Sequence, residues 1–124
     1  MIYGIGNDII EIERIKKAIL KEGFIRKVCT EKEIENLKKR GNREESYAGI
    51  FSAKEAIAKA VGLGVRNYSL TDMEILNDDF GKPYVLISEK LDKIIRERFG
   101  TYNIELSISH SKEYATAIAI IFKS

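Results

Sequence analysis

The sequence has one cysteine, one proline, one histidine and no tryptophan among its 124 residues. The single Cys29 excludes a disulfide within the chain, and with only His110 to assist it cannot build a Cys/His zinc cluster. The longest apolar run, near Ala115 to Phe122, is too short to cross a bilayer. The N-terminus lacks the basic start and apolar stretch of a signal peptide, so we expect a reduced, cytoplasmic protein.

The net charge of the chain is also small. It carries 21 basic and 19 acidic residues, a formal net charge of +2 at pH 7. This balance argues against a polycation that coats nucleic acid. Hydrophobic residues make up 44% and charged residues 32% of the sequence, a mixture typical of a soluble globular protein. Because no repeat, low-complexity tract or linker interrupts the chain, we expect one domain over residues 1–124.

Hydrophobic periodicity predicts an α+β fold in which helices pack against a mainly antiparallel sheet. Apolar residues with a period of two predict strands over residues 2–6, 73–77, 84–88 and 104–109, and a continuous apolar run predicts a strand over residues 114–122. Helical spacing predicts helices over residues 9–20, 30–40, 44–61 and 89–99, with Gly62-Leu-Gly64 as the stop of the third. The last strand is apolar on both faces, so we expect it at the centre of the sheet or covered by another subunit.

A carboxylate follows the first predicted strand, in the segment Gly4-Ile-Gly6-Asn-Asp8. Glycines admit close approach of the backbone, and a carboxylate beside them suits a hard cation or a phosphate-bearing ligand. The alternative is that Asp8 is the N-cap of a helix beginning at Ile9, since aspartate is a preferred cap residue. The residues alone leave both interpretations open.

Three polar residues share one face of the helix predicted over residues 44–61. Ser52, Glu55 and Lys59 are spaced i, i+3 and i+7. A glutamate four residues before a lysine is usually an ordinary surface ion pair. The surrounding alanines weaken that interpretation, because they are typical of a helix packed closely against a sheet.

The only histidine lies in Ser107-Ile-Ser109-His110-Ser111, at the end of a predicted strand. Neighbouring strand residues point to opposite faces, so the serine and histidine side chains do not form a catalytic dyad. We interpret His110 as a donor or packing surface for a ligand. The alternative is an imidazole satisfied by a neighbouring side chain.

Basic residues are concentrated between Arg14 and Lys27, where Glu22 is the only acidic residue and Phe24 and Ile25 lie among the charges. Such a segment suggests an acidic protein partner, an anionic membrane or nucleic acid. It is equally compatible with a solvated helix face.

Four motifs, in this order along the chain, resemble one family. They are Gly4-Ile-Gly6-Asn-Asp8-Ile-Ile-Glu11-Ile-Glu-Arg14, then Phe51-Ser-Ala-Lys54-Glu55-Ala-Ile-Ala-Lys59-Ala60 closed by Gly62-Leu-Gly64, then Gly81-Lys-Pro83-Tyr, then Ser107-Ile-Ser-His110-Ser. The family is the holo-acyl-carrier-protein synthases, the short trimeric type of 4′-phosphopantetheinyl transferase. The resemblance covers almost the whole chain. It implies the 4′-phosphopantetheinyl transferase fold, assembled as a homotrimer with active sites between subunits.

The resemblance implies a transferase of fatty acid biosynthesis that moves 4′-phosphopantetheine from coenzyme A to a serine of apo-acyl carrier protein. The other product is adenosine 3′,5′-bisphosphate. In this family the aspartate of the first motif and the glutamate of the second bind Mg²⁺, which assigns Asp8 and Glu55 here. Two carboxylates, phosphate oxygens and waters form a common Mg²⁺ coordination shell. With Lys59, placed to reach the diphosphate, these carboxylates are the predicted catalytic residues.

The resemblance also suggests contacts for the two substrates. The residues expected to contact coenzyme A are Lys54, Lys59, Gly62, Pro83, His110 and Ser111. The residues expected to dock the acidic carrier protein are Arg14, Lys17, Lys21, Phe24 and Arg26. For the proton of the serine hydroxyl, a metal-bound water is the first candidate acceptor and Glu11 the second.

One position departs from the family pattern. Ile50 stands where members often carry a basic residue, and Arg43 or Arg66 are candidates to replace that charge. The competing hypothesis is a non-catalytic nucleotide- or coenzyme-binding module, which does not require Asp8 and Glu55 together. A nucleic-acid-binding protein using the basic helix is a further alternative, and it predicts affinity that falls steeply with salt.

Overall fold

The first strand, β1 (Ile2–Glu11), pairs antiparallel with the last, β5 (Tyr114–Phe122), in a computed structural model that describes residues 1–62 and 64–124. β5 also pairs antiparallel with β4 (Asn103–His110), so it is the central strand of a three-stranded sheet of order β1-β5-β4. The predicted central position of this apolar strand is confirmed.

A second, two-stranded sheet is formed by β2 (Met73–Asn77) and β3 (Pro83–Ile87), which also pair antiparallel. The predicted α+β class and antiparallel pairing are therefore confirmed. The strands of the described residues divide between two sheets, however, whereas the sequence predicted one. A period of two identifies a strand but not its partner, because pairing depends on segments far apart in the chain.

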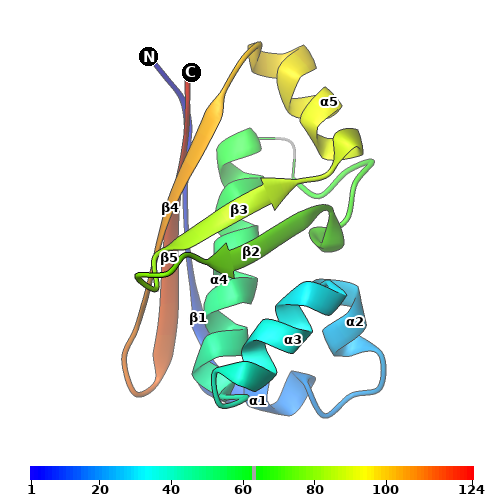
Figure 1. Ribbon diagram of the computed structural model, residues 1–124, viewed down its shortest axis with the longest axis vertical. Coiled ribbons are helices and arrows are strands. Elements are labelled where there is room, and N and C mark those ends of the chain that lie inside the picture. Colours follow the sequence, from blue (N-terminus) through cyan, green and yellow to red (C-terminus); the bar gives the residue numbers. More distant parts are fainter. Residues whose placement is uncertain (63) are drawn as a thin grey trace.

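The helices lie on one side of the three-stranded sheet, and α4 runs along its length (Figure 1). Their bounds are α1 (Ile12–Ala18), α2 (Phe24–Val28), α3 (Glu31–Lys39), α4 (Glu44–Val61) and α5 (Glu89–Phe99), with a 3-10 turn, η1, at Leu70–Asp72. The predicted capping box of α3 is present, with Glu33 N donating to Thr30 Oγ1 at 3.2 Å. α4 ends where predicted, at a left-handed Gly62, while Leu63 of the predicted stop lies outside the described residues.

The start of the first helix was predicted three residues too early. β1 continues through Glu11, and Asp8 pairs with Ala117 inside it. The interpretation of Asp8 as a helix N-cap is therefore wrong, and Glu11 ends a strand instead of lying on a helix. The physical reason is that β5 is long enough to pair with β1 as far as Tyr114, so the ladder extends the strand.

β1 and α4 pack with their backbones in close contact. A Cβ atom on Gly4 would collide with the carbonyl oxygen of Ala60, and one on Gly6 would collide with the carbonyl oxygen of Ala56. The sequence suggested that these glycines admit a ligand, but the structure fills that space with a helix. Glycine on the strand and alanine on the helix together allow this approach.

Two hydrophobic clusters hold the elements together. One packs the C-terminal half of α4 against α5, β2 and the inner face of the three-stranded sheet, and it includes Ile57, Met73, Leu91 and Ile95. The other packs α1, α2 and α3 against the N-terminal half of α4 and includes Ile15 and Leu37. α4 therefore belongs to both clusters and positions the residues that it carries relative to the rest of the molecule.

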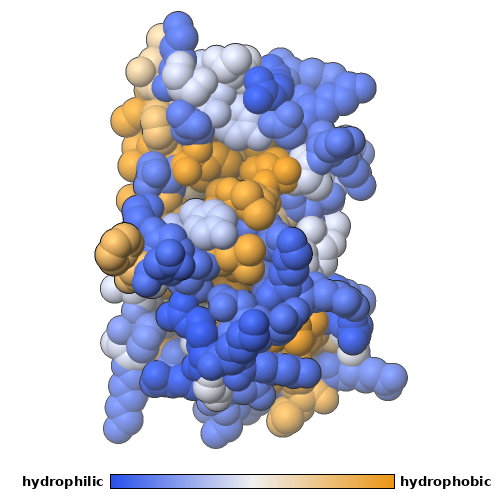
Figure 2. All heavy atoms as spheres, viewed as in Figure 1, coloured by the Kyte–Doolittle hydropathy of each residue, from blue (hydrophilic) through white to orange (hydrophobic). Residues whose placement is uncertain are grey.

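The outer face of the three-stranded sheet is not covered by any described element of the chain (Figure 1), and it exposes apolar residues on β1 and β5 and polar residues on β4. Ile5, Ile9 and Ile118 are 58%, 63% and 43% exposed. In Figure 2 apolar residues gather along the upper part of the left edge of the view, where this sheet lies, and polar residues occupy the lower part. Among the described residues, no helix has the length and apolar character needed to span a membrane.

Candidate functional site

Asp8 meets α4 at a small polar cluster between β1 and the helix. Lys59 Nζ donates to Asp8 Oδ1 at 3.1 Å and to the Asn7 carbonyl oxygen at 3.0 Å. Ser52 Oγ lies 3.0 Å from Asp8 Oδ2 and 3.2 Å from the Asp8 carbonyl oxygen, and donates toward them. Each carboxylate oxygen thus has its own donor, which fixes the orientation of the side chain.

Glu55 belongs to the same cluster, one helical turn from Lys59. Burial raises the pKa of the Glu55 carboxyl above its ordinary value, and the nearby Asp8 charge raises it further, while Lys59 lowers it. The two carboxylates repel each other, and the single ammonium of Lys59 does not neutralise both of them. The predicted convergence of Asp8, Glu55 and Lys59 is therefore present in the fold.

The donor set of this cluster suits a hard divalent cation. Asp8 and Glu55 offer carboxylate oxygens, the ligands that Mg²⁺ prefers, and a cation between them would relieve their repulsion. Within the described part of the chain no group of three or more His, Cys, Asp or Glu side chains could hold a metal ion. Two protein ligands still fit Mg²⁺, since it usually retains several waters and binds substrate phosphates.

Tyr68 lies in the core near this cluster. Its hydroxyl is buried and has no hydrogen-bond partner among the described residues. Burial raises the pKa of the Tyr68 hydroxyl, and the charge of Glu55 adds to the effect. A buried hydroxyl without a partner carries a desolvation cost.

His110 and Pro83 lie elsewhere, in the wall of a cavity of about 260 Å³. The cavity is bounded by α3, the N-terminal half of α4, and the strands β2, β3 and β4. Arg40, Glu45 and Ile50 also line it. Asp8, Glu55 and Lys59 do not, so the two polar sites of one chain are separate.

The remaining residues predicted to contact coenzyme A are spread over the fold. Gly62 follows the last residue of α4, whereas His110 ends β4 and Ser111 follows it. Ser111 is exposed, and its hydroxyl accepts from the Tyr114 backbone N–H at 3.3 Å. A single chain does not bring these residues together, and their contact with coenzyme A stays a prediction.

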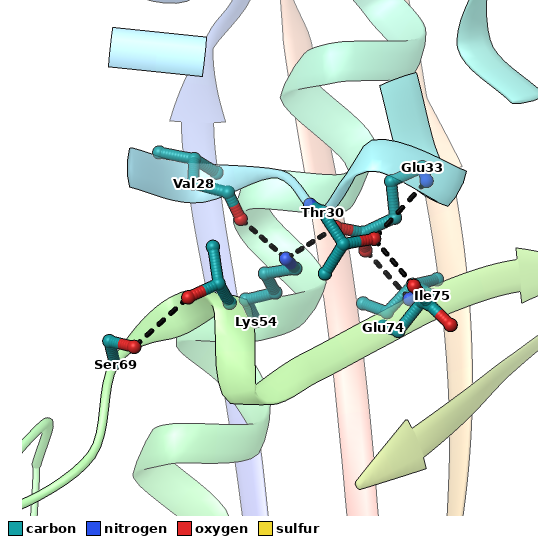
Figure 3. Close-up of polar contacts among 8 residues, drawn as sticks. Val28, Thr30, Glu33, Lys54, Ser69, Glu74 and Ile75 are labelled. Carbon is teal, nitrogen blue, oxygen red and sulfur yellow. Dashed lines mark hydrogen bonds and ion pairs between the residues drawn. The ribbon is translucent and has the colours of Figure 1, made fainter. Parts of the chain in front are cut away.

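The prediction that Lys54 contacts coenzyme A is wrong for this fold. Its side chain is completely buried, and its ammonium donates to the Glu33 carboxylate at 2.7 Å and to the Val28 carbonyl (Figure 3). Neighbouring helix residues are rotated by about 100° from each other, so Lys54 and Glu55 point in different directions. Nothing in the residue pattern indicates that Glu33, on another helix, is the partner of this lysine.

The basic segment forms the surface of α1, α2 and the loop between them. Arg14, Lys17, Lys21 and Arg26 are exposed. Phe24 is half-buried, and its ring centroid lies 6.1 Å from that of Phe51 on α4. The residues predicted to dock a carrier protein therefore share one region, and their role stays a prediction.

Two residues of these sites were not predicted to have a role. Ser52 is fully buried and donates to Asp8, although its spacing with Glu55 and Lys59 already placed it on their face of the helix. Arg40 lines the cavity beside Ile50, the position at which members of the family often carry a basic residue and this chain does not. Arg43, one suggested replacement, forms an ion pair with Glu45 at 2.8 Å.

Comparison with known proteins gives consistent results. Residues 4–119 match the model of the 4′-phosphopantetheinyl transferase superfamily. The chain is 73% identical over 121 residues to a holo-[acyl-carrier-protein] synthase from Fusobacterium nucleatum, and the match covers 98% of this chain and 99% of that protein.

Solved structures of holo-[acyl-carrier-protein] synthases are similar to this chain over almost its whole length. A crystal structure of holo-[acyl-carrier-protein] synthase from Neisseria meningitidis matches with a TM-score of 0.90 at 35% identity, covering 99% of this chain and 100% of that one. A holo-(acyl-carrier-protein) synthase from Bacillus anthracis, in complex with CoA (3′,5′-ADP), matches with a TM-score of 0.83 at 42% identity, covering 100% and 99%.

Proposed function

The chain belongs to the 4′-phosphopantetheinyl transferase superfamily as a holo-[acyl-carrier-protein] synthase, and we propose that it loads an apo-acyl carrier protein from coenzyme A. The serine oxygen of the carrier attacks the phosphorus that bears pantetheine, and the bond from that phosphorus to the leaving phosphate of adenosine 3′,5′-bisphosphate breaks. The serine proton leaves with a basic group or water. The convergence of Asp8, Glu55 and Lys59 is the observation that carries this proposal.

The reaction needs the developing negative charge to be stabilised and the reactants to be held in line. Asp8 and Glu55 would hold Mg²⁺, which when bound polarises the diphosphate as a Lewis acid. Lys59, 55% exposed, is free to move its ammonium from Asp8 toward a phosphate oxygen. Ser52 keeps Asp8 oriented throughout, because its hydroxyl is buried and bound to the carboxylate.

The cavity lined by His110 and Pro83 is the candidate site for the nucleotide part of coenzyme A. Arg40 and His110 offer donors for phosphate, and the walls are otherwise mixed polar and apolar. Gly62 and Ser111 remain proposed contacts to coenzyme A. A bound coenzyme in the Bacillus anthracis relative, which is similar over the whole chain, supports a coenzyme site in this fold.

The basic surface of α1 and α2 is the proposed docking site for the acidic carrier protein. Charged residues there increase the association rate of an acidic partner, and an apolar residue adds contact area. The residues concerned are Arg14, Lys17, Lys21, Phe24 and Arg26. A non-catalytic binding module would not need two mutually repelling carboxylates beside a lysine, so the structure favours the transferase.

We further propose that the protein works as a homotrimer with active sites between subunits. Ile5, Ile9 and Ile118 form an exposed apolar sheet face that a neighbouring copy would bury. The separation of the His110 cavity from the Asp8 cluster is also explained if neighbouring chains contribute one site each. Ile118→Asp should yield monomers in native mass spectrometry and abolish transfer; a stable monomer with full activity would contradict the assembly.

The central experiment incubates the protein with apo-acyl carrier protein, coenzyme A and Mg²⁺ and follows the mass of the carrier. We expect a gain of one phosphopantetheine, which EDTA, Asp8→Ala and Glu55→Ala each abolish. Glu97→Ala, which removes an exposed carboxylate on α5, is the matched control and should leave transfer unchanged. Modification that survives both site variants would overturn the metal assignment, and an unmodified but competent carrier would overturn the function.

A further inference from the structure

The buried ion pair between Lys54 and Glu33 joins α4, the helix that carries Glu55 and Lys59, to α3, the helix that follows the proposed docking helix α2. Lys54 lies on α4, next to Glu55, and Glu33 lies in the first turn of α3. Both side chains are fully buried, with Lys54 Nζ 2.7 Å from Glu33 Oε1. Figure 3 shows the pair between the end of α2, the start of α3 and strand β2.

The groups around this ion pair are extensively hydrogen-bonded. Lys54 also donates to the carbonyl oxygen of Val28, the last residue of α2. Glu33 Oε1 accepts from the Thr30 backbone N–H at 2.8 Å, and Glu33 Oε2 accepts from the Ile75 backbone N–H at 2.7 Å. The turn between α2 and α3 is therefore attached to α4 on one side and to β2 on the other.

A further hydrogen bond attaches the same turn to β2. Thr30 Oγ1 donates to Glu74 Oε2 at 2.6 Å, while its hydroxyl oxygen accepts from Glu33 N (Figure 3). Thr30, the N-cap of α3, thus bonds to both α3 and β2. Several independent contacts at one turn make its position more rigid than a single ion pair would.

The docking helix α2 depends on these contacts. It has five residues, far fewer than an isolated helix needs to be stable in water. Besides its packing in the hydrophobic cluster of α1, α3 and α4, two contacts hold it: the Phe24–Phe51 ring contact at its start and the Lys54 bond to the Val28 carbonyl at its end. Both Phe51 and Lys54 lie on α4, within four residues of Glu55.

We propose that Lys54 and Glu33 are positioning residues that fix α2 and α3 relative to Glu55, so that a carrier protein docked on α2 presents its serine at the catalytic cluster. The inference rests on the proposed function and deepens it. Neither residue touches coenzyme A or the carrier. Their effect is on geometry, and small displacements of a docked substrate reduce the rate strongly.

Three variants test the proposal. Lys54→Met breaks the pair and leaves Glu33 charged and buried. Lys54→Met/Glu33→Gln removes both charges, and the glutamine oxygen can still accept from one of the two backbone N–H groups that Glu33 binds, which should restore part of the thermal stability. Ile95→Ala opens a cavity in the other hydrophobic cluster and serves as a matched control for stability loss without any contact to α2.

We expect the double variant to raise the KM for the carrier by about tenfold, equivalent to about 1.4 kcal/mol, while the KM for coenzyme A stays within a factor of about two. Amide hydrogen exchange should accelerate over residues 24–39 in both Lys54 variants and not in Ile95→Ala. A purely structural role predicts instead that the double variant regains wild-type kinetics, or that the control raises the carrier KM equally. Either result would overturn the inference.

The proposed function and this inference fail in different ways. If the wild-type protein transfers no phosphopantetheine, the function is wrong whatever the variants do. If the wild type is active and hydrogen exchange over residues 24–39 is unchanged in the double variant, the positioning role is wrong and the function stands. Because hydrogen exchange is measured on the protein alone, it reports on the attachment of α2 without any substrate.

Discussion

Two neighbouring residues of α4 belong to charge clusters with opposite properties. Lys54 and its partner Glu33 are fully buried, and backbone groups of three other segments complete their hydrogen bonds. Glu55 lies in a more open cluster, where burial and then the like charge of Asp8 raise its pKa and Lys59, 55% exposed, compensates only in part. Two consecutive residues of α4 thus differ in their surroundings. The charge of Lys54 is paired with Glu33, whereas the charge of Glu55 is only partly compensated.

The difference is the one expected between a structural ion pair and a binding site. A buried pair with complete hydrogen bonding has no capacity left for a ligand, and removing one member is costly. A cluster with excess negative charge gains free energy when a cation binds, and such perturbed groups are concentrated at functional sites. Lys54 and Glu55 therefore differ in whether neighbouring groups neutralise their charge, and the residue types alone do not show this difference.

The largest effect on stability should come from the closed cluster. Glu33→Ala leaves the Lys54 ammonium buried without a carboxylate and removes the acceptor of the Ile75 N–H. We expect a loss of about 3–5 kcal/mol in the free energy of unfolding, measured by urea denaturation. Lys59→Ala, which breaks the half-exposed pair with Asp8, should cost less than about 1 kcal/mol. Equal losses would remove the distinction between the clusters.

A smaller effect of opposite sign is expected in the open cluster. The raised pKa of Glu55 means that the folded state holds this proton at pH values where the unfolded state has released it. The carboxyl therefore lowers stability progressively as the pH rises above its ordinary range. Without metal, Glu55→Gln should raise the free energy of unfolding at neutral pH, because it removes a carboxylate whose charged form burial and Asp8 disfavour.

This gain should disappear below the ordinary pKa of a glutamate, where both states are protonated. Thermal unfolding of the two proteins from acid to neutral pH measures it. Added Mg²⁺ should stabilise the wild type more than the variant. A variant less stable than the wild type at neutral pH would show that Glu55 is satisfied within the chain, as Glu33 is.

The smallest effect is expected at Tyr68, whose buried hydroxyl has no partner among the described residues. Tyr68→Phe removes that group without changing the ring, so stability should stay the same or rise by at most about 1 kcal/mol. Urea denaturation checks this. A loss of more than about 1 kcal/mol in the free energy of unfolding would indicate that the Tyr68 hydroxyl is hydrogen-bonded to an ordered water molecule.

Local features of the fold could be predicted from the sequence, and contacts between distant segments could not. The capping box of Thr30 and Glu33 depends on residues three positions apart and was predicted correctly. That Glu33 also holds Lys54 depends on a contact across 21 positions, for which the sequence offers no signal. The length of β1 was misjudged for the same reason, because β5 determines it.

The cluster of Asp8, Glu55 and Lys59 was predictable only through the resemblance to a family. Helical spacing placed Ser52, Glu55 and Lys59 on one face, but nothing in the spacing brings Asp8 to them. In the structure that meeting depends on two glycines of β1 lying against the alanines of α4. The glycines and alanines are visible in the sequence, but only the three-dimensional structure shows that they pack against each other.

The contact of Gly4 and Gly6 with Ala60 and Ala56 has a consequence for evolution. Main-chain atoms of the strand and the helix touch directly there, so the gap between Asp8 and Glu55 does not depend on the size of any large side chain. We therefore expect the spacing of the two carboxylates to be more sensitive to a side chain added at either glycine than to exchanges among bulky interior residues elsewhere. Selection should act against any larger residue at the two glycines.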